Sequence, residues 1–138
     1  MYFLIYNINT GKIDVTGSGK EYKRLILEPF TKVMITKTII DPTKQYIDVE
    51  YKEVIDRPEL DINWNKTTII NDGIDTASCE LEAGFNVVIF IPNIFREKLI
   101  SDGSDIEINS TVISDVIVTI DKFPYKKYQQ IIEVILNE

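Results

Sequence analysis

Short apolar runs separated by turn sequences recur along most of this 138-residue chain and indicate β-strands. The clearest case lies at residues 116–121, where Val116, Val118 and Ile120 alternate with neighbours of mixed character and form one apolar face. Residues 85–91 are almost continuously apolar and end at Pro92, which predicts a central strand in the core. The pattern therefore predicts a mainly-β fold.

The N-terminal part begins with a hairpin signature. Residues 2–8 and 13–16 flank the turn sequence Asn9-Thr10-Gly11-Lys12, and Gly17-Ser18-Gly19 is expected to end the second strand. Residues 20–27 predict a short helix, because Tyr22, Leu25 and Ile26 have helical spacing before Pro29. Three further strands are expected around the turn at Asp41-Pro42, at residues 33–40, 45–49 and 53–56.

A boundary is expected at Arg57-Pro58, where proline favours extended backbone and the charge balance changes. This divides the chain into an N-terminal module, residues 1–58, and a C-terminal module, residues 59–138. The second module has short apolar runs separated by turn sequences, which predicts six or seven strands in an immunoglobulin-like β-sandwich. The expected strands are residues 62–70, 77–81, 85–91, 106–108, 116–121 and 128–136, and the short apolar pieces at residues 99–100 and 111–112 are the candidates for a seventh.

Charge is distributed unevenly between the two modules. Nine Lys/Arg against eight Asp/Glu give the first module +1, and six against fourteen give the second −8. An acidic surface argues against binding to nucleic acid, which requires clustered positive charge. The apolar start of the chain predicts a strand and not a signal peptide, and no run reaches the length of a membrane span. We therefore expect a soluble protein made in a cytoplasm, with neither nucleic acid nor membrane as a partner.

Catalytic and metal-binding residue patterns are missing from the sequence. The chain has no histidine, which excludes histidine-dependent nucleophile relays and His zinc sites, and its one cysteine, Cys79, is expected to be buried. Two Asp-Gly-x-Asp segments, at residues 72–75 and 102–105, are interpreted as turns and not as calcium loops. Neither a G-x-S-x-G elbow nor a distinctive carboxylate pair occurs. We expect a non-enzymatic protein without cofactor or metal.

Aromatic side chains are the candidate contacts with a partner. They can anchor a protein or stack on a sugar, although aromatic residues more often fill cores. Trp64 follows the expected boundary and is a candidate for wedging the two modules together. The candidate partner-binding residues are Tyr46, Tyr51, Trp64, Tyr125 and Tyr128.

Several segments resemble a family of small bacteriophage tail-fibre and tail-associated proteins. The first module matches through residues 6–13, 16–17, 41–48 and 54–58, which include the turn at Gly11 and the Arg57-Pro58 pair. The second module is similar to the bacterial immunoglobulin-like modules of phage tails through residues 71–73, 81–84, 102–107 and 123–125. Where the family has Pro-Gly before the last long strand, this chain has Ile113-Ser114-Asp115.

The resemblance implies a structural protein of the phage virion, made in the bacterial host. We expect a tail adaptor or accessory protein, whose first module docks to the particle and whose second module attaches or presents tail fibres. Its partners are then other tail proteins, in a symmetric multimer on the virion. The alternatives are a glycan-binding attachment module, a capsid decoration protein, and a tail-fibre assembly chaperone absent from the finished particle.

Overall fold

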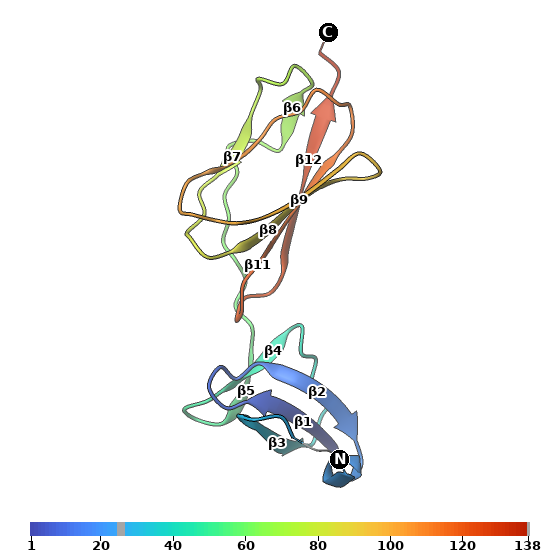
Figure 1. Ribbon diagram of the computed structural model, residues 1–138, viewed down its shortest axis with the longest axis vertical. Coiled ribbons are helices and arrows are strands. Elements are labelled where there is room, and N and C mark those ends of the chain that lie inside the picture. Colours follow the sequence, from blue (N-terminus) through green and yellow to red (C-terminus); the bar gives the residue numbers. More distant parts are fainter. Residues whose placement is uncertain (25–26, 138) are drawn as a thin grey trace. The chain divides into compact units, whose positions relative to one another are not determined.

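The computed structural model of the chain describes residues 1–24 and 27–137, and it is built almost entirely of β-strands (Figure 1). The prediction of a mainly-β fold is confirmed. The chain divides into two compact units, Met1–Pro58 and Glu59–Glu138, each with its own hydrophobic core. In the described part of the chain, no helix has the length and hydrophobicity that a membrane span requires.

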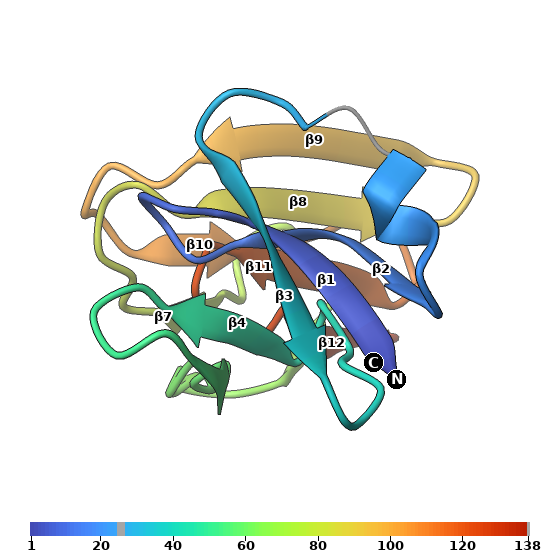
Figure 2. The ribbon, with the colours of Figure 1, turned by 90° about the horizontal axis from the view of Figure 1, so that it is seen from below.

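The first unit contains a three-stranded sheet and a two-stranded sheet. In the larger sheet the order is β2-β1-β3 and both pairings are antiparallel, and a 3-10 turn, η1, lies next to β2 (Figure 2). In the smaller sheet β4 pairs antiparallel with β5. The elements are β1 (Tyr2–Asn7), β2 (Ile13–Ser18), η1 (Glu21–Arg24), β3 (Thr31–Thr36), β4 (Gln45–Asp48) and β5 (Glu53–Asp56).

A close backbone approach joins the hairpin turn of the first unit to β4. Gly11 adopts a φ of +81°, and its carbonyl accepts a hydrogen bond of 2.8 Å from the N–H of Ile47. A Cβ added at Gly11 would lie 1.8 Å from the carbonyl oxygen of Ile47. Glycine therefore satisfies both the left-handed conformation and the contact between the two backbones. The contact places Ile47, which is fully buried, in the same core as Leu4 and Tyr6.

Two expectations for the first unit are wrong. Gly17 and Ser18 do not end the second strand but belong to β2, because Gly17 leaves space for the buried ring of Phe3, its partner on β1. The strand expected at residues 33–40 ends at Thr36, whose hydroxyl donates to the carbonyl of Thr38 and stabilises a bend.

The helix expected at residues 20–27 is observed as the 3-10 turn Glu21–Arg24. Leu25 and Ile26 lie outside the described residues, so the remainder of that prediction is not tested.

The second unit contains a five-stranded and a two-stranded sheet. The larger has the order β6-β12-β11-β8-β9, in which only the β12–β6 pair is parallel, and β8 and β9 lie side by side in Figure 2. In the smaller sheet β7 pairs antiparallel with β10. The strands are β6 (Thr68–Ile70), β7 (Ala77–Cys79), β8 (Asn86–Ile91), β9 (Phe95–Ile100), β10 (Ile106–Ile108), β11 (Val116–Asp121) and β12 (Tyr128–Ile135).

One hydrophobic core is shared by the two sheets of the second unit. The alternating residues Val116, Val118 and Ile120 of β11 are almost completely buried, as their spacing predicts. They pack in the same cluster as Cys79 of β7 and Ile106 of β10. This packing of side chains from both sheets excludes water from the interior and is the main source of stability of the unit.

Three strand predictions for the second unit are corrected. Only Thr68–Ile70 of the expected strand 62–70 is a strand. Thr111 and Val112 form no strand, because the N–H of Val112 donates to the hydroxyl of Ser110 in a local turn. The expected strand at residues 99–100 begins earlier, at Phe95. Charged residues at three of its first four positions, Phe95-Arg96-Glu97-Lys98, conceal the strand in the sequence.

Candidate functional site

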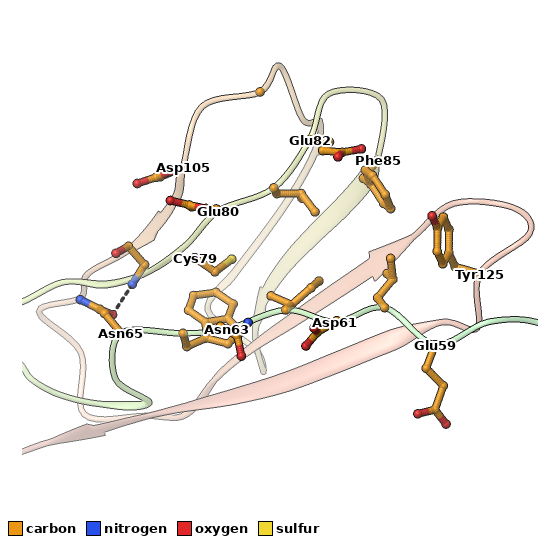
Figure 3. A pocket seen from close by; sticks show the side chains of 16 residues that line it. Glu59, Asp61, Asn63, Asn65, Cys79, Glu80, Glu82, Phe85, Asp105 and Tyr125 are labelled. Carbon is orange, nitrogen blue, oxygen red and sulfur yellow. Dashed lines mark hydrogen bonds between the residues drawn. The ribbon is translucent and has the colours of Figure 1, made fainter.

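The candidate site is a groove in the second unit, with a volume of about 1070 Å³ (Figure 3). It lies between the segment formed by residues 59–65 and the segment that contains β7 and the following loop. Five of the sixteen residues that line it are acidic and none is basic. We call it the acidic groove; its carboxylates belong to Glu59, Asp61, Glu80, Glu82 and Asp105.

The groove exists because residues 59–65 are extended but scarcely paired. Leu60, Ile62 and Trp64 alternate with exposed residues and pack against the core, as one face of a strand does. The pairing with β7 is nevertheless limited to a single bridge, Trp64 with Cys79. Figure 3 shows the two segments joined near Asn65 and separating toward Tyr125.

Asn65 ends the pairing by binding backbone groups with its side chain. Its Oδ1 accepts hydrogen bonds from the N–H of Ser78, at 2.7 Å, and from that of Lys66, also at 2.7 Å. Its own N–H donates to the carbonyl of Ser78 at 3.0 Å. A side chain that takes the place of a backbone partner interrupts a ladder, so the strand expected at residues 62–70 is broken here.

Three aromatic side chains line the groove, and we call them its aromatic floor: Trp64, Phe85 and Tyr125. The Nε1–H of Trp64 donates to the hydroxyl of Tyr128 at 3.0 Å, and both rings pack against the core. Toward the other end, the ring centroids of Phe85 and Tyr125 are 5.9 Å apart. These contacts fix the rings, so the floor is rigid and partly apolar.

Two carboxylates face each other at the end of the β7–β10 ladder. The last pair is Cys79 with Ile106, so Glu80 and Asp105 occupy the next cross-strand position. Figure 3 shows them side by side on one rim. Like charges in such a position repel each other, and neither forms an ion pair with any residue that the structure describes. This rim is therefore a local concentration of negative charge.

Two lysines lie near the end of the groove opposite to Asn65. The Nζ of Lys126 lies 3.8 Å from Glu59, and the Nζ of Lys122 lies 5.0 Å from the centroid of the Phe85 ring. Both lysines belong to the connection between β11 and β12 and are not part of the lining. They leave the pair Glu80 and Asp105 uncompensated.

Ser101 stabilises the loop formed by residues 82–85, which lines one end of the groove. Its hydroxyl accepts from the N–H of Phe85 at 2.9 Å and donates to the carbonyl of Glu82. Its backbone accepts from the N–H of Gly84 and donates to the carbonyl of Phe85. Because Ser101 is 5% exposed, these bonds are shielded from water and hold the loop in place.

The thiol of Cys79, which lines the groove, is not activated as a nucleophile. Burial raises the pKa of the Cys79 thiol to about 11, and the nearby carboxylate of Asp105 adds to the increase. The thiol is therefore neutral at physiological pH and a poor nucleophile. Within residues 1–24 and 27–137, no three His, Cys, Asp or Glu side chains are grouped as a metal site requires.

The two Asp-Gly-x-Asp segments are turns, with Gly73 and Gly103 at positive φ. Backbone N–H groups of Asp75 and Ile74 hold the pKa of Asp72 below its usual value. The hydroxyl and N–H of Ser104 lower the pKa of Asp102 in the same way. These carboxylates act as hydrogen-bond acceptors that stabilise the turns.

The aromatic candidates from the sequence do not form one site. Trp64 and Tyr125 line the groove, and the hydroxyl of Tyr128, which is not part of the lining, accepts a hydrogen bond from Trp64. Tyr46 lies in β4 and Tyr51 lies in the turn that follows, both in the first unit. Trp64 packs against the core of the second unit, which gives the ring a role within that unit.

The acidic residues of the groove were not among the sequence candidates. The net charge of −8 indicated an acidic second module, but Glu80 and Asp105 come together only through the register of β7 and β10. The comparisons with known proteins find no matching family model, no matching curated protein and no matching solved structure.

Proposed function

We propose that the chain is a non-enzymatic adaptor whose second unit binds a partner protein through the acidic groove. The observation that supports this function is the groove itself, which combines a rigid aromatic floor with five carboxylates and no basic lining residue. Tyr and Trp side chains in well-packed pockets are typical of protein-binding sites. The thiol of Cys79 is neutral and the chain has no histidine to activate it, so a Cys-His catalytic pair is not part of the proposal.

The setting that we propose is a bacteriophage tail, where the chain attaches or presents fibres. This part of the proposal is supported by the resemblance of its turn sequences to small tail-associated proteins. The first unit then docks to the particle, and repetition of the chain by tail symmetry strengthens contacts that are individually weak.

We also propose that the second unit is an immunoglobulin-like sandwich. The arrangement of its strands supports this assignment. Strands β8, β11 and β12 lie in one sheet and match strands C, F and G of the immunoglobulin fold, and β7 and β10 lie in the other sheet and match strands B and E. The parallel pairing of β6 with β12 adds a short first strand to the larger sheet. Such modules present partner-binding loops and sheet faces on a stable core.

The adaptor function is tested by quantitative mass spectrometry of purified phage particles from cells that produce the chain. We expect a copy number that is a small multiple of the tail symmetry, and cross-links between the tail proteins and lysines near the groove, such as Lys126. Hundreds of copies per particle would indicate capsid decoration instead. Absence from intact particles, with abundant chain in infected cells, would refute the structural function and favour an assembly chaperone.

A further inference from the structure

We infer that the acidic groove binds an extended, cationic segment of the partner, in which Lys or Arg side chains alternate with apolar ones. This inference rests on the proposed adaptor function for the origin of its partner. Its chemical basis is the surface of the groove, which has a negative rim, an apolar floor and an incompletely paired strand edge.

The charge of the groove selects for a cation. Glu80 and Asp105 repel each other at adjacent cross-strand positions, so the free groove has an electrostatic cost that a bound ammonium or guanidinium group removes. Asp61 and Glu59 belong to the opposite segment, where Glu59 is directed away from Glu80 and Asp105 (Figure 3). Glu59 lies 3.8 Å from Lys126, so the uncompensated charge is that of Glu80 and Asp105. An acidic segment would instead be repelled.

The backbone of the groove selects for an extended chain. Beyond the bridge between Trp64 and Cys79, no backbone hydrogen bond joins residues 60–62 to residues 80–82 in the described chain. Both segments therefore present backbone groups along the groove, and a partner strand can pair with such an edge.

The side-chain period of a strand matches the two surfaces of the groove. Successive side chains of a strand point in opposite directions, so one set contacts the half-buried rings of Trp64 and Tyr125 while the other meets the carboxylates. A segment of about six residues has a length of about 20 Å, comparable with the seven-residue segment 59–65 that it follows.

Trp64 provides a direct reporter, because it is the single tryptophan of the chain and lies in the groove. The experiment titrates the full chain with a capped Lys-Val-Lys-Val-Lys-Val peptide at low salt and follows the Trp64 emission. We expect a saturable change that weakens at higher salt, because the paired charges are exposed and screened. A capped Glu-Val-Glu-Val-Glu-Val peptide and spermine, a cation without a peptide backbone, serve as comparison ligands and should bind much more weakly.

The chain offers a matched pair of control substitutions. The double variant E80Q/D105N removes the rim charges and should weaken peptide binding about fivefold, as the loss of two exposed charge contacts predicts. The double variant D115N/E133Q neutralises two exposed carboxylates that also lie just beyond a ladder pair, Val116 with Ile132, but outside the groove. It should leave the affinity within twofold.

Both double variants should fold, because all four carboxylates are exposed; circular dichroism checks this. No change in Trp64 emission, equal weakening by the two double variants, or equal binding of the acidic peptide would overturn the inference. Binding of spermine as tightly as the peptide would overturn the requirement for an extended backbone. Failure of peptide binding in a chain that is present on particles refutes the inference alone, whereas peptide binding by a chain absent from particles refutes only the tail function.

Discussion

Replacement of Ser101 by alanine tests whether the loop beside the groove is held by a buried hydrogen-bond pair. The substitution removes the hydroxyl that accepts from the N–H of Phe85 and donates to the carbonyl of Glu82, and no water replaces it readily at 5% exposure. A buried donor left without a partner costs about 1–3 kcal/mol. We therefore expect the S101A substitution to lower the free energy of unfolding of the second unit by about 2 kcal/mol.

The assay is urea unfolding followed by the emission of Trp64, which lies in the second unit. With a urea dependence of about 1 kcal/mol per molar for a unit of this size, the midpoint should fall by about 2 M. The control is Ser104→Ala, which removes an exposed hydroxyl bonded to Asp102 and should change the stability by less than about 0.5 kcal/mol. Equal effects of the two substitutions would refute the reasoning that burial makes the Ser101 bonds important.

Three further predictions concern other parts of the chain. Gly11→Ala should destabilise the first unit by about 2–4 kcal/mol, measured by hydrogen exchange, because the new Cβ combines a positive φ with a clash against the carbonyl of Ile47. Cys79, with a pKa raised to about 11, should react with a thiol reagent at pH 8 only as fast as the second unit opens; rapid labelling of the folded chain would contradict its burial. The hydrogen bond from Lys66 is the main cause that lowers the pKa of Asp75 in the folded chain. The ionised Asp75 carboxylate therefore stabilises the fold above about pH 4, and this stabilisation is lost as the pH falls through the lower, folded-state pKa. Asp75→Asn should therefore flatten the acid side of the stability profile; an unchanged profile would exclude Asp75 as a contributor.

Features that depend on residues close together along the chain could be predicted from the amino-acid sequence. Alternation within residues 116–121 specified which face of β11 is buried, because successive side chains of a strand point to opposite sides. The turn at Gly11 specified the first hairpin, since its ends are close along the chain. Competition of side chains for backbone hydrogen bonds was harder to predict. The side chains of Asn65 and Ser110 bind backbone N–H groups and so end or prevent strand pairing, and their positions in the sequence do not indicate this.

The residues of the groove come together through long-range pairing that the sequence pattern does not indicate. Trp64 and Tyr128 are 64 residues apart and share a hydrogen bond, and Glu80 meets Asp105 through the register of two short strands. A shift of register by one residue would reverse the faces of a strand and separate such neighbours. Register is selected by the packing of the whole core, so a local pattern predicts strands and their faces, whereas the groove and its charge arise only when the sheets assemble.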